Sequence, residues 1–185
     1  TREAFASYPA RVIVSKFSAS EDDSLHFTLN PTVPHLTEKE AVAITADAEN
    51  KTISLSGSLK QNGLQFAAKF QIVTDGTVTA GQDGNGNGTL TVDGAQDAVV
   101  IMSLGTDYLN DYDERYRTGE DPMDAVAKRL DAAVEKGYEA LRAEHIGDYQ
   151  SIFNNVTLSL GGEATNLNTD ELLSAYRADN NITSE

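Results

Sequence analysis

The feature that most constrains the fold of this chain is a change in its hydrophobic period at Asp121-Pro122. Before this point apolar and polar residues alternate, most clearly over residues 25–30 and 64–72, and a period of two predicts half-buried β-strands. After it, apolar residues recur every three or four positions, which predicts amphipathic helices. We therefore expect residues 1–118 to form an antiparallel β-sandwich and residues 119–185 to form a helical linker that contains one short strand.

About nine short strands, separated by turn signals, are expected in the first part. Asp75-Gly76 is one turn dipeptide, and Gly57 lies inside a strand pattern, where glycine indicates a bulge or a close approach of two backbones. The run at residues 98–102 is continuously apolar, as expected of a strand that is covered on both faces. Strands do not alternate with helices in this part, so the pattern indicates a mainly β fold with antiparallel sheets.

The second part is predicted to begin with one long surface helix. Asp121 is a natural N-cap, and Pro122 suits the first helical position. The apolar stripe of this helix consists of Met123, Val126, Leu130, Val134, Tyr138 and Leu141. We expect a second helical stretch at residues 146–153, a strand at residues 156–160, and a third helix that Thr169 caps and that runs through residue 176.

The charge of the chain narrows its possible partners. With 185 residues and a formal net charge of -15, its surface repels nucleic-acid phosphates and anionic lipids. We therefore expect neither nucleic acid nor a membrane surface as a partner, whereas neutral ligands such as sugars are compatible with this charge. The absence of cysteine excludes disulfides, thiolate metal sites and cysteine catalysis.

The start of the chain and its composition bear on where the protein works. The chain begins at Thr1 without an initiator methionine or a signal-peptide pattern, and we expect it to be a piece of a longer protein. It contains no run of about 18 apolar residues, the length needed to span a membrane. Composition does not fix the compartment, and an extracellular or cell-surface bacterial location is favoured over a cytoplasmic one.

Asp83, Asn85 and Asn87 form the one local motif with a chemical interpretation. Oxygen-bearing side chains at alternate positions, separated by glycines, match the first half of a calcium-binding loop. The second half does not match, because Gly94 stands where a bidentate glutamate is needed. Asn and Gly also suit a tight hairpin, since both tolerate positive φ. We expect a hairpin loop at residues 83–88 and no metal or organic cofactor, with a calcium site as the alternative.

Two further groups of polar residues are candidate sites. Carboxylates flanked by aromatic residues are concentrated in residues 107–114, where a pair of them could act as acid and base on a glycoside. Consecutive acids in a connector more often face solvent. His26, His35 and His145 are far apart in sequence and lack the spacing of metal ligands, and we expect His145 to make a structural hydrogen bond.

Several segments together resemble glycoside hydrolase family 95, whose members are α-L-fucosidases and related α-L-galactosidases. Residues 2–9, REAFASYP, are similar to the R-E-x-F-x-S-x-P strand pair of that family, and residues 105–108, GTDY, resemble a later block. The family also has an H-x-x-D-Y-x-x-x-F segment between its domains, which is matched here by the linker residues His145, Asp148, Tyr149 and Phe153. The likeness covers nearly the whole chain and keeps these blocks in order.

The resemblance implies the later part of a β-sandwich, itself part of a supersandwich, joined by linker helices to an (α/α)₆ catalytic barrel outside this chain. Because the family's catalytic residues belong to the barrel, none is assigned here. The implied parent is an inverting, cofactor-free glycoside hydrolase, so the implied partners are its own barrel and its carbohydrate substrate. We expect a non-catalytic scaffold that is inactive alone. Two alternatives are a freestanding carbohydrate-binding β-sandwich module and a small hydrolase that uses the acids near Asp107.

Overall fold

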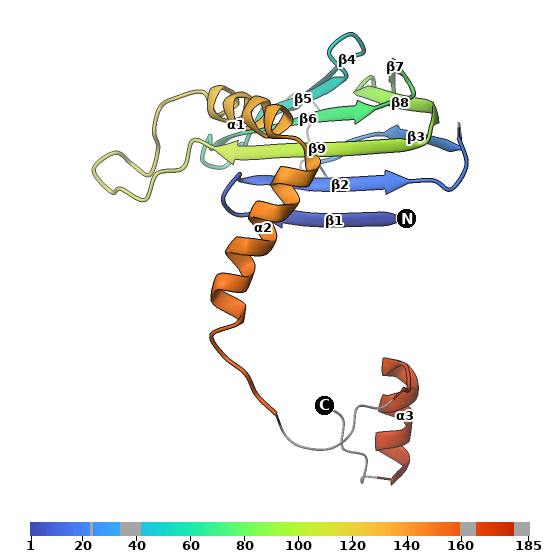
Figure 1. The fold of residues 1–185 in the computed structure, drawn as a ribbon. Coiled ribbons are helices and arrows are strands. Elements are labelled where there is room, and N and C mark those ends of the chain that lie inside the picture. The colour runs from blue at the N-terminus through green and yellow to red at the C-terminus, as the bar shows by residue number, and fades with distance from the viewer. Residues whose placement is uncertain (23, 34–41, 160–165, 180–185) are drawn as a thin grey trace. The chain divides into compact units, whose positions relative to one another are not determined.

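The computed structural model of this chain describes residues 1–22, 24–33, 42–159 and 166–179. It divides into two compact units, Thr1–Asp148 and Tyr149–Glu185. Nine strands and three helices are found within the described residues, and every strand lies in the first unit (Figure 1). The prediction of a mainly β, antiparallel fold followed by helices is confirmed.

The strands of the first unit form two antiparallel sheets of unequal size. The larger sheet has six strands in the spatial order β1 (Arg2–Ser7), β2 (Val12–Ser18), β9 (Asp97–Thr106), β6 (Gln65–Thr74), β5 (Thr52–Ser58) and β4 (Val42–Asp47). The smaller sheet has three strands in the order β3 (Leu25–Leu29), β8 (Gly88–Ala95) and β7 (Thr77–Gln82). Because β2 pairs with β9, strands far apart in sequence are neighbours in the larger sheet.

One hydrophobic core lies between the two sheets. Ile53 and Ile72 of the larger sheet are buried in the same cluster as Leu90 and Val92 of β8. Each such side chain stabilises the fold by about 1.5–3 kcal/mol relative to an exposed position. This core is built from the alternation that the sequence shows over residues 64–72 and in the neighbouring strands.

The opposite face of the larger sheet is covered by helix α1 (Pro122–Lys136) (Figure 1). The prediction of its start is confirmed, since the Asp121 carboxylate accepts a hydrogen bond from the Met123 N–H and Pro122 opens the helix. Val126 and Leu130 are fully buried. A second core therefore lies between α1 and the sheet, and its buried members are Val12, Val14, Ile101, Leu130, Ala133 and Leu141.

The prediction of one long helix through Leu141, followed by a second helix from residue 146, is wrong. α1 ends at Gly137, whose φ of 78° interrupts the helix, and α2 (Tyr138–Phe153) begins directly after it. Glycine adopts this conformation without the steric cost that a Cβ would bring. In the sequence, the helical spacing of apolar residues continues past Gly137 because Leu130 of α1 and Leu141 of α2 are buried in the same core.

The prediction of a strand at residues 156–160 is also wrong where it can be compared, because residues 156–159 form no strand. Val156 and Leu158 are 80% and 79% exposed, and a strand requires the backbone of a partner, which alternation alone does not supply. Leu160 lies outside the described residues. In the second unit α3 (Thr169–Asp179) confirms the predicted third helix, but Thr169 is its first helical residue rather than its cap. The N–H of Asn168, just before the helix, donates to the Glu171 carboxylate at 3.0 Å.

The domain boundary predicted between residues 118 and 119 stays a prediction; it falls in the loop before α1, whereas the compact units divide after Asp148. The difference arises because α1 and the start of α2 complete the second core of the sandwich. The helical segment up to Asp148 therefore belongs to the folded sandwich unit.

Ser103 of β9 gives a test of the packing under α1. Its side chain is fully buried, and its hydroxyl has no hydrogen-bond partner within the described residues. A buried polar group without a partner carries a desolvation penalty, so Ser103→Ala is expected to raise the free energy of unfolding by about 1 kcal/mol. Urea denaturation measures this change, with Ser56→Ala at an exposed position of the same sheet as the control. A loss of stability in Ser103→Ala would contradict the expectation.

Candidate functional site

The buried carboxylate of Asp107 ties the acid-rich loop to the sandwich. Asp107 is 2% exposed, and one of its oxygens accepts a hydrogen bond from the Gln65 N–H at 2.9 Å. The other oxygen lies 2.8 Å from Nε and 2.7 Å from Nη2 of Arg117. The Arg117 guanidinium also donates to the backbone carbonyls of Asn62 and Gly63. Asp107 and Arg117 therefore clamp the loop between β9 and α1 onto the turn between β5 and β6.

Asp111 also has a structural contact in this loop. Its carboxylate accepts a hydrogen bond from the Asp113 N–H at 2.9 Å, and its backbone carbonyl accepts one from the Tyr116 N–H at 2.8 Å. Asp113 and Glu114 are exposed. Of the acids at residues 107–114, Asp107 is thus buried and paired with Arg117, and Asp111 stabilises a turn. The proposed role of this segment as a hydrolytic site stays a prediction.

The loop at residues 83–88 connects β7 and β8 as a hairpin. One oxygen of the Asp83 carboxylate accepts hydrogen bonds from the N–H groups of Asn85 and Asn87 at 2.8 and 2.9 Å, and the other accepts one from the Asn87 side-chain amide at 3.1 Å. The backbone N–H of Asn87 is the main cause that lowers the pKa of Asp83 below its ordinary value. The carboxylate that would bind calcium is therefore used to close the loop.

The structure also explains why glycine occupies two positions of this motif. Gly86 has a φ of 84°, in the left-handed region that favours glycine. Gly88 is buried, and a Cβ there would lie 2.4 Å from the backbone N of Ala46 in β4. The Asp-Gly-Asn-Gly-Asn-Gly sequence is thus accounted for by a hairpin and by close packing of β8 on β4, independently of any metal.

The hairpin interpretation predicts that calcium leaves this loop unchanged. Calcium would have to replace the three hydrogen bonds to Asp83, so millimolar CaCl₂ is expected to leave the amide resonances of Asn85 and Asn87 in place. Two-dimensional NMR of the chain measures this. Asp83→Asn serves as the comparison, since it removes the carboxylate; a calcium-dependent shift in the wild type that is lost in this variant would establish the calcium site.

The histidines lie in different places. His26 on β3 contacts the Asp93 carboxylate on β8, and both side chains are exposed. His145 on α2 stacks on Phe5 of β1, with ring centroids 5.0 Å apart and an interplanar angle of 19°. His35 lies outside the described residues. Within the described part of the chain, no group of three or more His, Asp or Glu side chains is placed to hold a metal ion.

The first turns of α2 are anchored to the edge strand β1. Phe5 contacts the Tyr138 ring at 6.1 Å, and the Arg142 guanidinium donates to the Glu3 carboxylate at 2.6 Å. Burial is the main cause that raises the pKa of Tyr138 to about 12, and the hydrogen bond to Arg142 lowers that of Glu3. The sequence did not predict this cluster, although Phe5 lies within the segment REAFASYP at residues 2–9.

The four residues predicted for the linker all lie on α2, and the boundary between the compact units falls among them. His145 and Asp148 belong to the first unit, and Tyr149 and Phe153 belong to the second. The rings of Tyr149 and Phe153 stack at 5.2 Å. Five large apolar side chains are exposed between residues 149 and 158, namely Tyr149 at 56%, Ile152 at 71%, Phe153 at 62%, Val156 at 80% and Leu158 at 79%.

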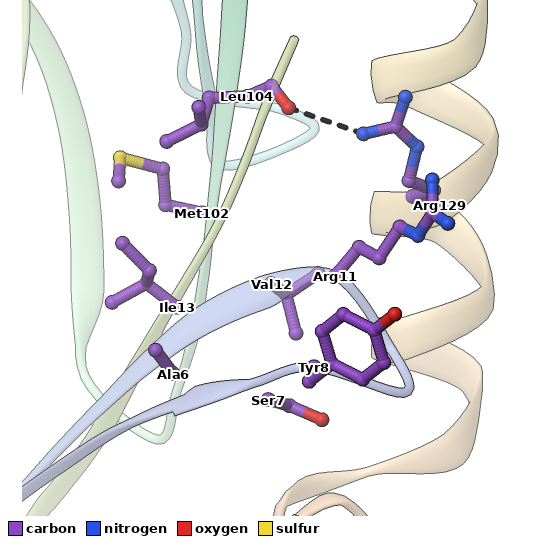
Figure 2. Close-up of a pocket in the computed structure, with 9 residues that line it drawn as sticks. All are labelled: Ala6, Ser7, Tyr8, Arg11, Val12, Ile13, Met102, Leu104 and Arg129. Carbon is purple, nitrogen blue, oxygen red and sulfur yellow. Dashed lines mark hydrogen bonds between the residues drawn. The ribbon is translucent and has the colours of Figure 1, made fainter.

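A shallow hollow of about 430 Å³ lies at the end of the β1–β2 hairpin (Figure 2). Its floor includes Ile13 and Met102, which are cross-strand partners. Arg11 and Arg129 line one side, and Arg129 donates a hydrogen bond to the Leu104 carbonyl at 3.1 Å, as Figure 2 shows. The hollow therefore offers apolar contact area and two guanidinium groups. No sequence signal marked it, because its residues come from three distant segments.

Among the helices of the described residues, none is both long enough and apolar enough to cross a bilayer.

Two curated proteins that are similar to this chain have names that describe α-fucosidases. The chain is 29% identical over 183 residues to "Alpha-L-fucosidase 2" of Arabidopsis thaliana, a match that covers 90% of this chain and 21% of that protein. It is also 29% identical over 188 residues to "Probable alpha-fucosidase A" of Aspergillus niger, covering 95% of this chain and 22% of that protein. The chain thus spans about a fifth of the length of these curated relatives.

The predicted resemblance to a glycoside hydrolase N-terminal domain is confirmed by these relatives and by a family model. Membership of family 95 and a bacterial origin stay predictions, and the two relatives are from a plant and a fungus. The model described as "Glycosyl hydrolase family 65, N-terminal domain" matches residues 1–111, more than half of the chain. The chain belongs to this family of glycosyl hydrolase N-terminal domains.

Proposed function

We propose that this chain is the non-catalytic N-terminal sandwich and linker of an α-L-fucosidase-like glycoside hydrolase, and that it supports a catalytic domain that follows it. The observation that carries the proposal is the run of exposed apolar side chains at residues 149–158. A group of large apolar side chains exposed close together in a chain indicates an interaction site, because leaving them in water is unfavourable. The natural occupant is the remainder of the enzyme, since relatives of this chain are about five times longer.

The chemistry of the parent enzyme is part of the same proposal. The names of the relatives support hydrolysis of α-L-fucosidic linkages. The catalytic barrel would supply the acid and base, would act with inversion and would need no metal or organic cofactor. The sandwich would hold that barrel through α2 and the segment after it. We propose an extracellular or cell-surface location for the parent.

The proposal is tested in a protein that joins this chain to the catalytic domain that follows it. Ile152→Asp and Phe153→Asp each place a charge on surface that would be buried between domains, and burying an unpaired charge is strongly unfavourable. We expect both variants to lower the thermal midpoint and the hydrolysis of 4-nitrophenyl α-L-fucoside. Tyr8→Asp, at an exposed aromatic residue of the β1–β2 turn, is the control and should change neither. Unchanged stability and activity in both α2 variants would refute docking through this surface.

A second candidate function is carbohydrate binding by the sandwich itself. It is favoured by one observation, the three exposed tyrosines Tyr108, Tyr112 and Tyr116 on the loop between β9 and α1.

A further inference from the structure

The loop at residues 107–118 projects beyond the ends of the strands, between β9 and α1 (Figure 1). It is nevertheless fixed at its base. Asp107 and Arg117 form the buried clamp, Tyr108 and Arg117 form an antiparallel bridge, and the Leu109 N–H donates to the Tyr116 carbonyl at 3.1 Å. A projecting loop that is held in this way presents its side chains in one geometry. Binding a ligand therefore costs the protein little conformational entropy.

The loop presents three exposed tyrosine rings, and the Tyr116 ring packs against the other two. Tyr108 and Tyr116 are parallel within 2° with centroids 6.3 Å apart, and Tyr112 meets Tyr116 edge-on at 6.2 Å. Their exposed fractions are 55%, 79% and 44% in chain order. These three residues are called the tyrosine face below. Exposed aromatic rings that are pre-arranged by their own contacts are typical of binding surfaces.

The backbone that carries the tyrosine face is strained. Arg115 and Tyr116 have φ values of 54° and 62°, in the left-handed region. This conformation costs about 1–2 kcal/mol for a residue with a Cβ, and it is uncommon for a bulky residue. The Tyr116 ring, which this backbone carries, packs against both other rings. Strain of this kind is found where a surrounding structure holds a functional geometry.

The chemistry around the rings selects a neutral, hydroxyl-rich ligand. Asn110, Asp113 and Glu114 are exposed beside the tyrosines and supply amide and carboxylate oxygens that accept hydrogen bonds from hydroxyl groups. The net charge of -15 disfavours an anionic ligand. A pyranose ring meets both requirements, because its C–H bonds pack on the electron-rich face of an aromatic ring while its hydroxyls point outward.

We propose that the tyrosine face binds a pyranose ring of a neutral glycan. The choice of sugar as the ligand rests on the membership of the chain in a glycosyl hydrolase domain family. The binding role goes beyond support of a catalytic domain, and it does not depend on whether residues 149–158 dock on that domain. The face would hold a sugar unit away from the reaction centre and so retain the substrate near the enzyme.

The test is an NMR titration of the chain with 2′-fucosyllactose, a neutral trisaccharide, with the resonances of residues 107–118 as the readout. We expect saturable shifts in this loop with millimolar affinity. Tyr112→Ala removes the most exposed ring and should weaken binding by about fivefold or more. Tyr112→Phe keeps the ring and should retain binding. Tyr8→Ala is the matched control, because Tyr8 is 77% exposed against 79% for Tyr112.

Three outcomes would overturn the proposal. They are the absence of any loop shift in the wild type, equal affinities of wild type and Tyr112→Ala, and an equal loss in Tyr112→Ala and Tyr8→Ala. A loop that docks on a protein domain instead would give the first of these. The outcomes are distinguishable from failure of the docking proposal, because the titration uses the chain alone and reads a different surface.

Discussion

Ending the chain at residue 118 is expected to abolish its cooperative folding, whereas ending it at Asp148 should leave the thermal midpoint of the sandwich nearly unchanged. The first truncation removes α1 and the start of α2, so Val12, Val14 and Ile101 lose the cover of Leu130 and Leu141. Losing the burial of these five side chains costs on the order of 10 kcal/mol, at about 1.5–3 kcal/mol each. That is comparable to the whole stability of a domain, which is about 5–15 kcal/mol.

Circular dichroism during thermal unfolding measures both truncations. Leu130→Ala in the full chain is a finer probe of the same core and should lower the free energy of unfolding by about 2–5 kcal/mol. Lys128→Ala, at an exposed position of α1, is its control and should change stability by less than about 0.5 kcal/mol. A chain of residues 1–118 that unfolds cooperatively at the midpoint of the full chain would contradict the view that α1 completes the sandwich.

Asp107→Ala is expected to lower the free energy of unfolding by about 3 kcal/mol, since it breaks a buried ion pair and leaves the Arg117 cation without its partner. The Gln65 N–H loses its acceptor as well. Arg117 is 26% exposed, so water offsets part of the cost and the effect should lie near the lower end of the range for buried pairs. Urea denaturation of the chain measures the change.

A double-variant cycle separates the clamp from other effects of this substitution. Asp107→Ala combined with Arg117→Ala should cost less than the sum of the two single variants, by about 0.5–3 kcal/mol, because each single change already removes the same contact. Asp113→Ala, at an exposed acid of the same loop, should change stability by less than about 0.5 kcal/mol. Strict additivity, or equal effects of Asp107→Ala and Asp113→Ala, would show that the clamp contributes nothing.

Local sequence patterns predicted the elements in which a residue has a single, local role, such as packing one strand face on the core or capping a helix. The alternation of Leu25, Phe27 and Leu29 predicted β3, because one face of that strand packs on the core. Asp121 predicted the start of α1, because a carboxylate at that position accepts a helix N–H. β4 was not singled out, since Ala46 and Ala43 weaken its alternation and its burial depends on contact with β5 and β8.

The features that sequence analysis missed depend on contacts between distant segments. Gly137 ended α1 at a point where the apolar spacing continued, because both helices pack on one core. The clamp of Asp107 and Arg117 could be proposed from charge alone, but its burial depends on the backbone carbonyls of Asn62 and Gly63. Aromatic residues beside the acids of residues 107–114 are visible in the sequence, but the geometry of the tyrosine face depends on the left-handed backbone at Arg115 and Tyr116.

The most direct test of the central claim measures hydrolysis of 4-nitrophenyl α-L-fucoside by this chain alone and by a protein that joins it to the domain that follows. The claim that the chain supports a catalytic domain and carries out no reaction of its own predicts turnover only in the longer protein. Turnover by the purified chain that is abolished in Asp111→Asn or Asp113→Asn would contradict it and would place a reaction centre in the acid-rich loop.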